Sequence, residues 1–130
     1  MAEPRVIAII DDDASVREAL ARLVRSLGYG AAVFASAEEY LRSSRVSSSA
    51  CLITDLNMPG MNGADLQDRL IADGHRTPII FMTAYFEDEV RARLLDAGAS
   101  GFLRKPFDDE SLIRCIDKAL EGRNGELAGQ

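Results

Sequence analysis

An acidic run and an isolated aspartate stand where carboxylates could gather around a cation. The acidic run 11–13 directly follows the apolar run 6–10, and Asp55 directly follows a second apolar run, 51–54. Carboxylates at the ends of neighbouring buried strands repel one another, so a fold that gathers them is stabilised by a cation. Mg²⁺ prefers hard oxygen ligands and binds through one or two carboxylates together with phosphate oxygens. The spacing therefore predicts a magnesium site.

Short apolar runs alternate with helical patterns along the chain. Apolar residues at helical spacing follow the strand-like segment 5–10, from Val16 to Leu27, before a stop at Gly28. Strands separated by single helices are parallel and covered on both faces. The sequence thus predicts an α/β three-layer sandwich with a doubly wound, five-stranded parallel sheet. The further strands are expected near 31–34 and at 51–54, 78–82 and 101–104, and the further helices at 37–43, 63–72, 87–97 and 109–120.

Local signals agree with these helix positions. Ser36 and Glu39 have the spacing of a capping box, acidic residues at 87–89 suit a first turn, and Gly98 suits a helix end. Asp13 stands where the first helix begins. Its position favours an N-cap over a metal ligand, although both roles stay open.

The polar residues that carry chemistry all follow expected strands. Asp55 follows the third strand, Thr83 the fourth and Lys105 the fifth. Ligands of open α/β sheets bind beyond the carboxyl ends of the strands, so these side chains converge with the acidic run. A carboxylate beside a metal can attack phosphorus and form an aspartyl phosphate. Asp55, alone on its loop, is the natural nucleophile, and Lys105 and Thr83 would donate to the phosphoryl oxygens.

Composition limits the classes of protein to which the chain can belong. Its 130 residues are 47% hydrophobic and 28% charged, which suits one domain with one core. No apolar stretch approaches the roughly 20 residues of a membrane span. The first residues also lack a basic region followed by a long apolar one, so we expect a soluble, cytoplasmic protein. A net charge of −6 disfavours nucleic-acid binding by this domain.

Three residues with reactive side chains receive no chemical role. Cys51 and Cys115 lie in apolar segments without metal-ligand spacing and are expected to be buried, reduced thiols. His75 lies in a polar turn and is expected to be a solvated loop residue.

Four motifs follow the expected strands in order and at spacing consistent with one domain. They are Asp11-Asp12, Asp55-Leu56-Asn57-Met58-Pro59-Gly60-Met61-Asn62-Gly63, Thr83-Ala84 and Lys105-Pro106-Phe107. Together they resemble the receiver domain of two-component response regulators, from about Arg5 to Leu120. The resemblance implies a flavodoxin-like (βα)5 fold with the strand order 2-1-3-4-5.

The resemblance implies a metal site and a phosphorylation site. Asp55 matches the phosphoacceptor, which is also a metal ligand. Asp11 and Asp12 match the acid pair that binds Mg²⁺, and Asn57 stands where a backbone carbonyl completes the metal site. Lys105 matches the lysine that reaches the phosphoryl group, and a cis peptide is expected between it and Pro106.

The implied mechanism is a switch and not a turnover enzyme. A histidine kinase supplies the phosphoryl group, and the hydroxyl of Thr83 is drawn toward it. Phe102 then turns into the vacated space, and the change biases a two-state equilibrium across the fourth helix, fifth strand and fifth helix. Phe102 replaces the frequent tyrosine, so a purely structural role as a partly buried strand residue is an equal alternative.

Two further positions are those that tune the lifetime of the acyl phosphate in receivers. They are Asn57 and Tyr85, two residues beyond Asp55 and Thr83. Tyr85 is bulky enough to restrict access of water. Packing of Tyr85 on the fourth helix is the favoured alternative.

Charged residues near the expected switch face leave dimerisation open. Mixed charge could pair across a two-fold axis, or it could simply be solvated surface. The residues are Arg91, Arg93, Arg104, Asp96, Asp108, Asp109, Asp117 and Glu121.

The last residues are polar and contain glycine. We expect a receiver domain at 1–121 and a disordered tail or linker at 122–130. The chain is either a stand-alone receiver or the receiver portion of a longer regulator. The pattern resembles receivers that often precede helix-turn-helix outputs, so a DNA-binding domain beyond Gln130 is one of the two alternatives.

Two rival functions fit parts of the pattern. A phosphatase of the haloacid dehalogenase type could use Asp11 and Asp13 with Thr83 and Lys105, but it leaves Asp55 and its loop unexplained. A pseudo-receiver would bind a partner without phosphorylation. The presence of every expected site residue argues against it.

Overall fold

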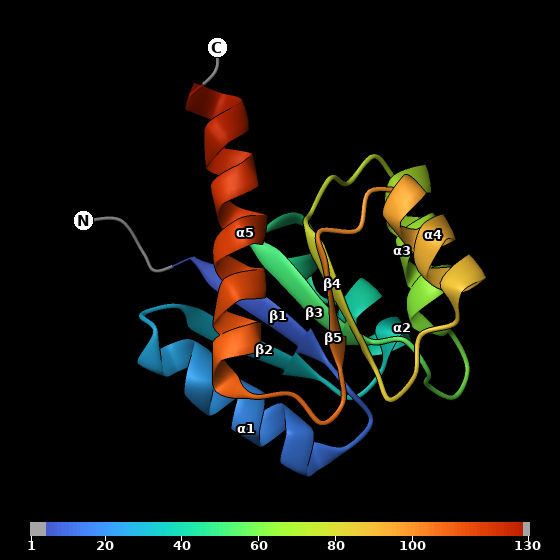
Figure 1. Cartoon of the computed structure of the whole chain (residues 1–130), viewed down its shortest axis with the longest axis horizontal. Helices are drawn as coiled ribbons and strands as arrows, with labels where there is room; N and C mark the ends of the chain where they lie inside the picture. Colours follow the sequence, from blue (N-terminus) through green and yellow to red (C-terminus); the bar gives the residue numbers. More distant parts are fainter. Residues whose placement is uncertain (1–4, 129–130) are drawn as a thin grey trace.

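The computed structural model describes the backbone of residues 5–128 and the side chains of residues 5–121. Its five strands form one parallel sheet in the order β2-β1-β3-β4-β5 (Figure 1). The strands are β1 Val6–Ile10, β2 Gly30–Phe34, β3 Cys51–Asp55, β4 Ile79–Thr83 and β5 Gly101–Arg104. The helices are α1 Ala14–Ser26, α2 Ala37–Leu41, α3 Gly63–Ala72, α4 Asp88–Asp96 and α5 Asp109–Ala128, with a 3-10 turn, η1 Ser44–Ser47.

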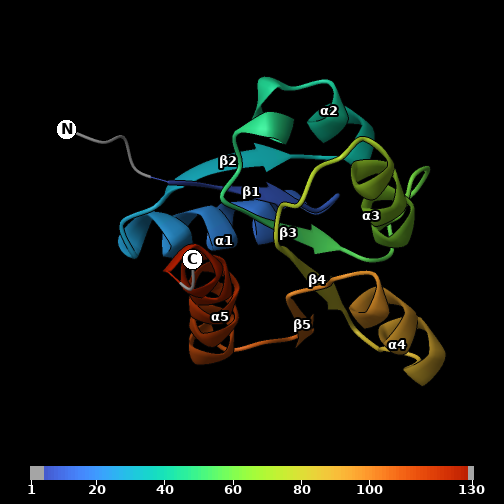
Figure 2. The same ribbon diagram turned by 90° about the horizontal axis from the view of Figure 1, so that it is seen from above.

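Helices cover both faces of the sheet. Helices α1 and α5 lie on one face, and α2, α3 and α4 lie on the other (Figure 2). Strand β1 shows why its apolar run is continuous: Ile7 and Ile9 pack in the cluster under α1 and α5, whereas Ala8 and Ile10 pack in the cluster under the other helices. The predicted doubly wound, flavodoxin-like sandwich with the order 2-1-3-4-5 is confirmed.

The strand order reverses beside β1, and this reversal positions the site. Strand β1 pairs with β2 on one side and with β3 on the other. Ile10 lies directly opposite Thr54 in the β1–β3 ladder, so the next residues, Asp11 and Asp55, emerge side by side. Ligands of doubly wound sheets bind at this point.

The helix-start predictions are mostly confirmed. The carboxylate of Asp13 caps α1 by accepting hydrogen bonds from the backbone N and hydroxyl of Ser15, at 2.9 and 2.7 Å. Ser36 caps α2 by accepting from the N–H of Glu39 at 3.1 Å. The capping box is incomplete, because the carboxylate of Glu39 accepts from Ala35 instead of Ser36. Gly98 follows α4 with a φ of +109°, as expected of a helix end.

Two element boundaries differ clearly from the predictions. The expected helix 37–43 ends at Leu41 and is followed by η1, where Ser43 caps the next turn. Helix α5 continues to Ala128, beyond the expected end at 120. Glu121, Arg123, Glu126 and Leu127 favour a helix around Gly122 and Gly125, and each glycine costs a helix only about 1 kcal/mol. The expected tail or linker at 122–130 is therefore helical to Ala128, and its role as a linker stays a prediction.

Both cysteines are free thiols, but only Cys51 is buried as expected. Cys115 is partly buried. Within residues 5–128, none of the helices combines the length and apolarity needed to cross a membrane.

Candidate functional site

Three carboxylates meet at the carboxyl ends of β1 and β3. One oxygen from each of Asp11, Asp12 and Asp55 lies within 4.8 Å of the others. Asp11 is fully buried, Asp55 is 7% exposed and Asp12 is exposed to solvent. The cluster predicted from the strand ends is therefore present, with one side open to water.

The ammonium of Lys105 lies between the two buried acids. Its Nζ is 2.8 Å from Oδ2 of Asp11 and 3.0 Å from Oδ2 of Asp55. Burial lowers the pKa of Lys105, but the hydrogen bonds and charges of Asp11 and Asp55 outweigh burial and raise the pKa overall. The loop that carries Lys105 has the expected cis peptide before Pro106, and the Lys105 N–H donates to the carbonyl of Thr83 at 2.7 Å.

The backbone orients both buried carboxylates in the same way. Oδ1 of Asp11 accepts the N–H of Asp13 at 2.9 Å, and Oδ1 of Asp55 accepts the N–H of Asn57 at 3.0 Å. Each acid thus presents one oxygen to its own loop and the other to Lys105. Arg17 also holds the acidic loop, because its Nη1 donates to the carbonyl of Asp11 at 2.7 Å. The sequence did not indicate Arg17, since an arginine in a first helical turn is not distinctive.

Thr83 and Asn57 are bonded to each other. Nδ2 of Asn57 donates to Oγ1 of Thr83 at 2.8 Å, and that hydroxyl donates to the carbonyl of Tyr85 at 3.4 Å. Thr83 is 2% exposed, so its hydroxyl relies on these partners more than on solvent. Both residues were expected at the site, but the bond between them was not.

Phe102 is partly buried against aromatic rings and a cation. Its ring stacks on Phe81 with a centroid separation of 6.4 Å and meets the edge of Phe86 at 5.3 Å. The guanidinium of Arg91 lies 5.0 Å from the centroid of the Phe102 ring. This is the partly buried strand residue of the structural alternative, and a switching role for Phe102 stays a prediction.

Tyr85 and His75 both lie in loops between helices and strands. Tyr85 is 69% exposed, so the expectation that it packs on the fourth helix is wrong. The loop before α4 turns its side chain into solvent. His75 lies in the loop after α3, and its backbone N–H closes that helix by donating to Leu70.

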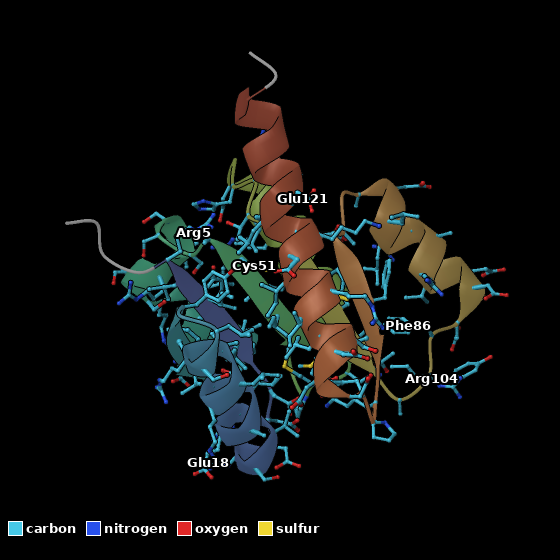
Figure 3. All side chains as sticks on the ribbon, turned by 60° about the vertical axis from the view of Figure 1, so that its left-hand side comes forward. Arg5, Glu18, Cys51, Phe86, Arg104 and Glu121 are labelled. Carbon is cyan, nitrogen blue, oxygen red and sulfur yellow. The ribbon has the colours of Figure 1, made fainter. Side chains whose placement is uncertain are left out.

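The three arginines near the expected dimer face bind within the domain. Arg93 pairs with Asp68 of α3 at 3.2 Å, and Arg91 lies over Phe102. Nε of Arg104 donates to the carbonyl of Ala84 at 3.3 Å, which places Arg104 along the loop that also carries Phe86 (Figure 3). These contacts do not test dimerisation.

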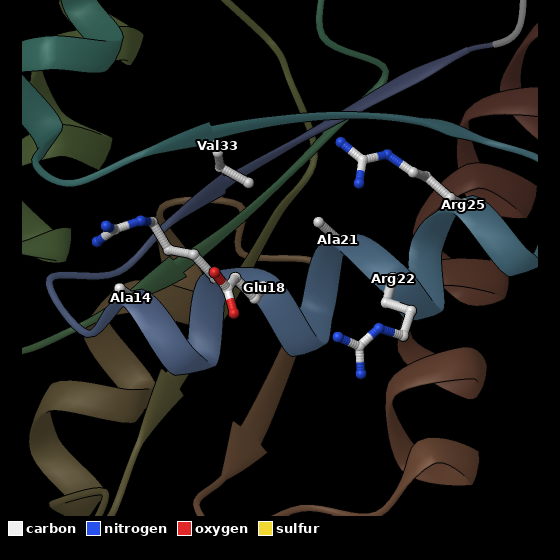
Figure 4. A pocket seen from close by; sticks show the side chains of 7 residues that line it. Ala14, Glu18, Ala21, Arg22, Arg25 and Val33 are labelled. Carbon is white, nitrogen blue, oxygen red and sulfur yellow. The ribbon is translucent and has the colours of Figure 1, made fainter.

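A separate hollow of about 620 Å³ lies between α1 and β2. Val33 faces α1 across it, and Arg25 extends toward the strand whereas Arg22 extends away from it (Figure 4). The acidic cluster does not line this hollow.

The donor set of the acidic cluster fits Mg²⁺. All its ligand atoms are carboxylate oxygens, and three acids face a single lysine, so negative charge is in excess. Mg²⁺ takes oxygen ligands and keeps several waters, which the exposed side at Asp12 can accommodate. Asp13 lies outside the cluster and caps α1, which removes the second acid that a haloacid dehalogenase would need.

The doubly wound sheet, with clustered acids and a lysine where the strand order reverses, defines the class of this domain: an α/β domain with a candidate metal site at its switch point. The response regulator receiver domain matches residues 7–117, and the chain belongs to this family. Receiver domains are signalling domains and not conventional enzymes, and the family implies a histidine kinase partner.

Named relatives support this assignment. The response regulator protein TodT of Pseudomonas putida is 41% identical over 116 residues, which cover 89% of this chain and 51% of TodT. The transcriptional regulatory protein FixJ of Azorhizobium caulinodans is 35% identical over 130 residues, covering 100% of this chain and 61% of FixJ. A solved structure of the response regulator StyR has a TM-score of 0.87 and 35% identity, covering 98% of this chain and 64% of StyR. The chain spans about half the length of the curated relatives it matches.

Proposed function

We propose that Asp55 accepts a phosphoryl group from a phosphohistidine of a histidine kinase. One observation carries the proposal: Lys105 bridges Asp11 and Asp55 inside the acidic cluster, at 2.8 and 3.0 Å. A nucleophile, a cation that can stabilise the transferred group and a set of metal ligands therefore lie within reach of one another. This combination is what phosphoryl transfer requires.

The covalent step uses the carboxylate of Asp55 as nucleophile. One of its oxygens bonds to phosphorus while the phosphorus–nitrogen bond of phosphohistidine breaks, and the imidazole leaves with the electron pair. Lys105 and the hydroxyl of Thr83 donate to the phosphoryl oxygens. Lys105 needs little displacement, because it already lies 3.0 Å from Oδ2 of Asp55.

Asp11, Asp12, Asp55 and the backbone carbonyl of Asn57 would hold Mg²⁺. Bound there, Mg²⁺ would offset the negative charge of the incoming phosphoryl group. Asp11 is kept in place for this task by the N–H of Asp13 and by Arg17 on its carbonyl.

Phosphorylation would act as a switch through Thr83. Its hydroxyl would leave Asn57 and turn to the phosphoryl group on Asp55, and Phe102 would follow into the vacated space. The two conformers would differ at α4, β5 and α5, the face proposed for homodimerisation or output. Asn57 and the exposed Tyr85 stand where they could control the attack of water and thereby the lifetime of the acyl phosphate.

In the whole protein, this domain would receive the signal and pass it on by protein contact. The chain matches 51% of the length of TodT and 61% of that of FixJ. This supports a receiver portion at 1–121 that is followed by an output domain, and a stand-alone receiver is the alternative. We propose a cytoplasmic location, where a histidine kinase would present its phosphohistidine.

Phosphorylation by a small-molecule donor tests the proposal. With acetyl phosphate and Mg²⁺, the parent protein should gain the mass of one phosphoryl group, and Asp55→Asn should not. Removal of Mg²⁺ by a chelator should abolish labelling. Labelling that persists in Asp55→Asn but disappears in Asp11→Asn would instead indicate phosphatase-like chemistry. A parent that neither acetyl phosphate nor a kinase labels would be a pseudo-receiver.

A further inference from the structure

The loop between β3 and α3 carries the phosphoacceptor's neighbours and is anchored firmly at both ends. At its start, the N–H of Leu56 donates to the carbonyl of Met82 at 2.8 Å. At its end, Asn62 and Asp65 form a complete capping box, and the N–H of Gly63 donates to Leu56 at 2.9 Å. The middle of the loop, 58–61, belongs to neither the sheet nor the helix.

A glutamate from another element holds this middle part. Oε2 of Glu38, on α2, accepts the backbone N–H of Met61 at 3.2 Å. Gly60 has a φ of +75°, and a Cβ placed on it would lie only 2.7 Å from Oε2 of Glu38. The positive φ favours glycine at position 60, and a side chain there would displace the carboxylate of Glu38 from its present place.

The two carboxylate oxygens of Glu38 have different surroundings. One of them, Oε1, is buried and has no hydrogen-bond partner, and it is the single such side-chain atom found within residues 5–121. Its own backbone N–H and that of Met61 hold the pKa of Glu38 below the usual value, so the group is ionised at neutral pH. Buried acceptors without partners are rare because they lose hydration without compensation. The N–H of Met61 therefore holds the carboxylate of Glu38 in an orientation that leaves Oε1 without a partner.

The held segment is connected to the site by a short and stiff path. Between Met61 and Asn57 the chain includes Met58, which is buried in the core, and Pro59, whose φ is fixed, so few backbone rotations are free to absorb a shift at Met61 before it reaches Asn57. The N–H of Asn57 orients Asp55, and its side chain holds Thr83.

We propose that Glu38 is a positioning residue for the phosphoryl-transfer site, fixing the loop that carries Asn57 by accepting the N–H of Met61. The inference rests on the proposed function of Asp55. It adds to that function a residue on α2, which lies outside all four motifs recognised in the sequence.

Helix α2 supplies a matched control. Glu39 is the next residue, is exposed, and also accepts one backbone N–H, that of Ala35, at 3.2 Å. Glu38→Ala and Glu39→Ala therefore remove the same charge, the same atoms and one hydrogen bond each to a residue outside the helix. Glu38→Gln keeps an oxygen acceptor for Met61 and separates loss of charge from loss of the hydrogen bond.

Four quantities should be measured on each variant. Three report on the loop: the rate of phosphorylation by acetyl phosphate at saturating Mg²⁺, the dissociation constant for Mg²⁺ from the NMR shift of the Asn57 amide, and the rate of hydrogen exchange at the Met61 amide. The fourth is the free energy of unfolding. We expect Glu38→Ala to slow phosphorylation about tenfold, since small displacements of reacting groups carry penalties of this size. It should also weaken Mg²⁺ binding and speed hydrogen exchange at Met61. Glu39→Ala should leave all three loop readouts unchanged, and Glu38→Gln should recover most of the parent's rate.

The outcomes separate this inference from the proposed function. An active parent with equal rates in Glu38→Ala and Glu39→Ala overturns the positioning role, as does a Glu38→Ala variant that changes only in its free energy of unfolding. A Glu38→Gln variant as slow as Glu38→Ala shows that charge and not the hydrogen bond matters, which also overturns it. A parent that takes no phosphoryl group and binds no Mg²⁺ contradicts the proposed function itself.

Discussion

The side-chain amide of Asn57 donates a hydrogen bond to the hydroxyl of Thr83, at 2.8 Å, and so joins the loops that follow β3 and β4. This bond is made to the Thr83 hydroxyl, which is the group proposed to move upon phosphorylation. To donate to a phosphoryl oxygen, the hydroxyl must give up the Tyr85 carbonyl that accepts its proton, and its movement also breaks the bond from Asn57, so the bond from Asn57 favours the unphosphorylated conformer.

A double-mutant cycle measures this bond. Asn57→Ala and Thr83→Val should each lower the free energy of unfolding, and the double variant should lose less than their sum. We expect a coupling of about 1 kcal/mol, the usual net value of a hydrogen bond between neutral groups. Chemical denaturation of the four proteins without Mg²⁺ gives this value. Additive losses would show that the bond contributes nothing in solution.

Lys105 stabilises the site in the absence of a metal, and Lys105→Met should reveal this. Its side chain is 25% exposed, so we expect a loss of about 2 kcal/mol in the free energy of unfolding, less than for a fully buried pair. Mg²⁺ should bind the variant more tightly than the parent, because no ammonium then competes for Asp11 and Asp55. Chemical denaturation without Mg²⁺ checks the loss of stability and calorimetric titration checks Mg²⁺ binding, with the exposed Lys118→Met as control in both. Weaker Mg²⁺ binding by Lys105→Met would contradict the competition.

The sequence could predict which residues reach the site, but not how they contact one another. Asp11, Asp55 and Lys105 follow apolar runs, and the carboxyl ends of parallel strands necessarily meet at one edge, so topology alone brought them together. The bond from Asn57 to Thr83 and the contact of Glu38 with Met61 depend on side-chain directions across separate elements. No short-range pattern reports such contacts. The end of α5 was missed because glycine and polar residues in a helix lower its stability without ending it.

Gly63 begins α3 in direct contact with the phosphoacceptor's strand. A Cβ on Gly63 would lie 2.9 Å from the carbonyl oxygen of Asp55 and 3.0 Å from Cα of Leu56, and backbone atoms cannot rotate away. Gly63→Ala should therefore cost about 1–3 kcal/mol of stability, as overpacking does, and should slow phosphorylation.

Gly74→Ala is a suitable control for that substitution. Gly74 has a φ of +83° with open space around it, so alanine there should meet only backbone strain, about 1–2 kcal/mol, and leave phosphorylation unchanged. Thermal denaturation and acetyl phosphate labelling compare the two variants. A Gly63→Ala protein with the parent's stability would show that the strand and helix can separate freely.

Arg91 holds the ring of Phe102 through a cation–π contact of 5.0 Å. Arg91→Ala should lower the free energy of unfolding by about 0.5–1 kcal/mol, as for other exposed contacts of this kind, and should free the Phe102 ring to change rotamer. NMR contacts between Phe102 and Phe86 report the ring position. Arg93→Ala is the matched control, because its guanidinium pairs with Asp68 instead. Equal effects of both substitutions on Phe102 would exclude a specific role for Arg91.

The two thiols should be protected from alkylation to different degrees. Burial raises the pKa of Cys51 to about 12, and burial also raises the pKa of the partly buried Cys115. The thiolate is the reactive form, so at pH 8 only about one ten-thousandth of Cys51 could react even if reagent reached it. Iodoacetamide should therefore modify Cys115 slowly and first, and Cys51 only when the protein unfolds. Mass spectrometry of native and urea-treated protein distinguishes the sites. Labelling of Cys51 before Cys115 in the native protein would contradict this prediction. It would mean that β3, the central strand, becomes exposed to solvent more often than the contact between α5 and β5.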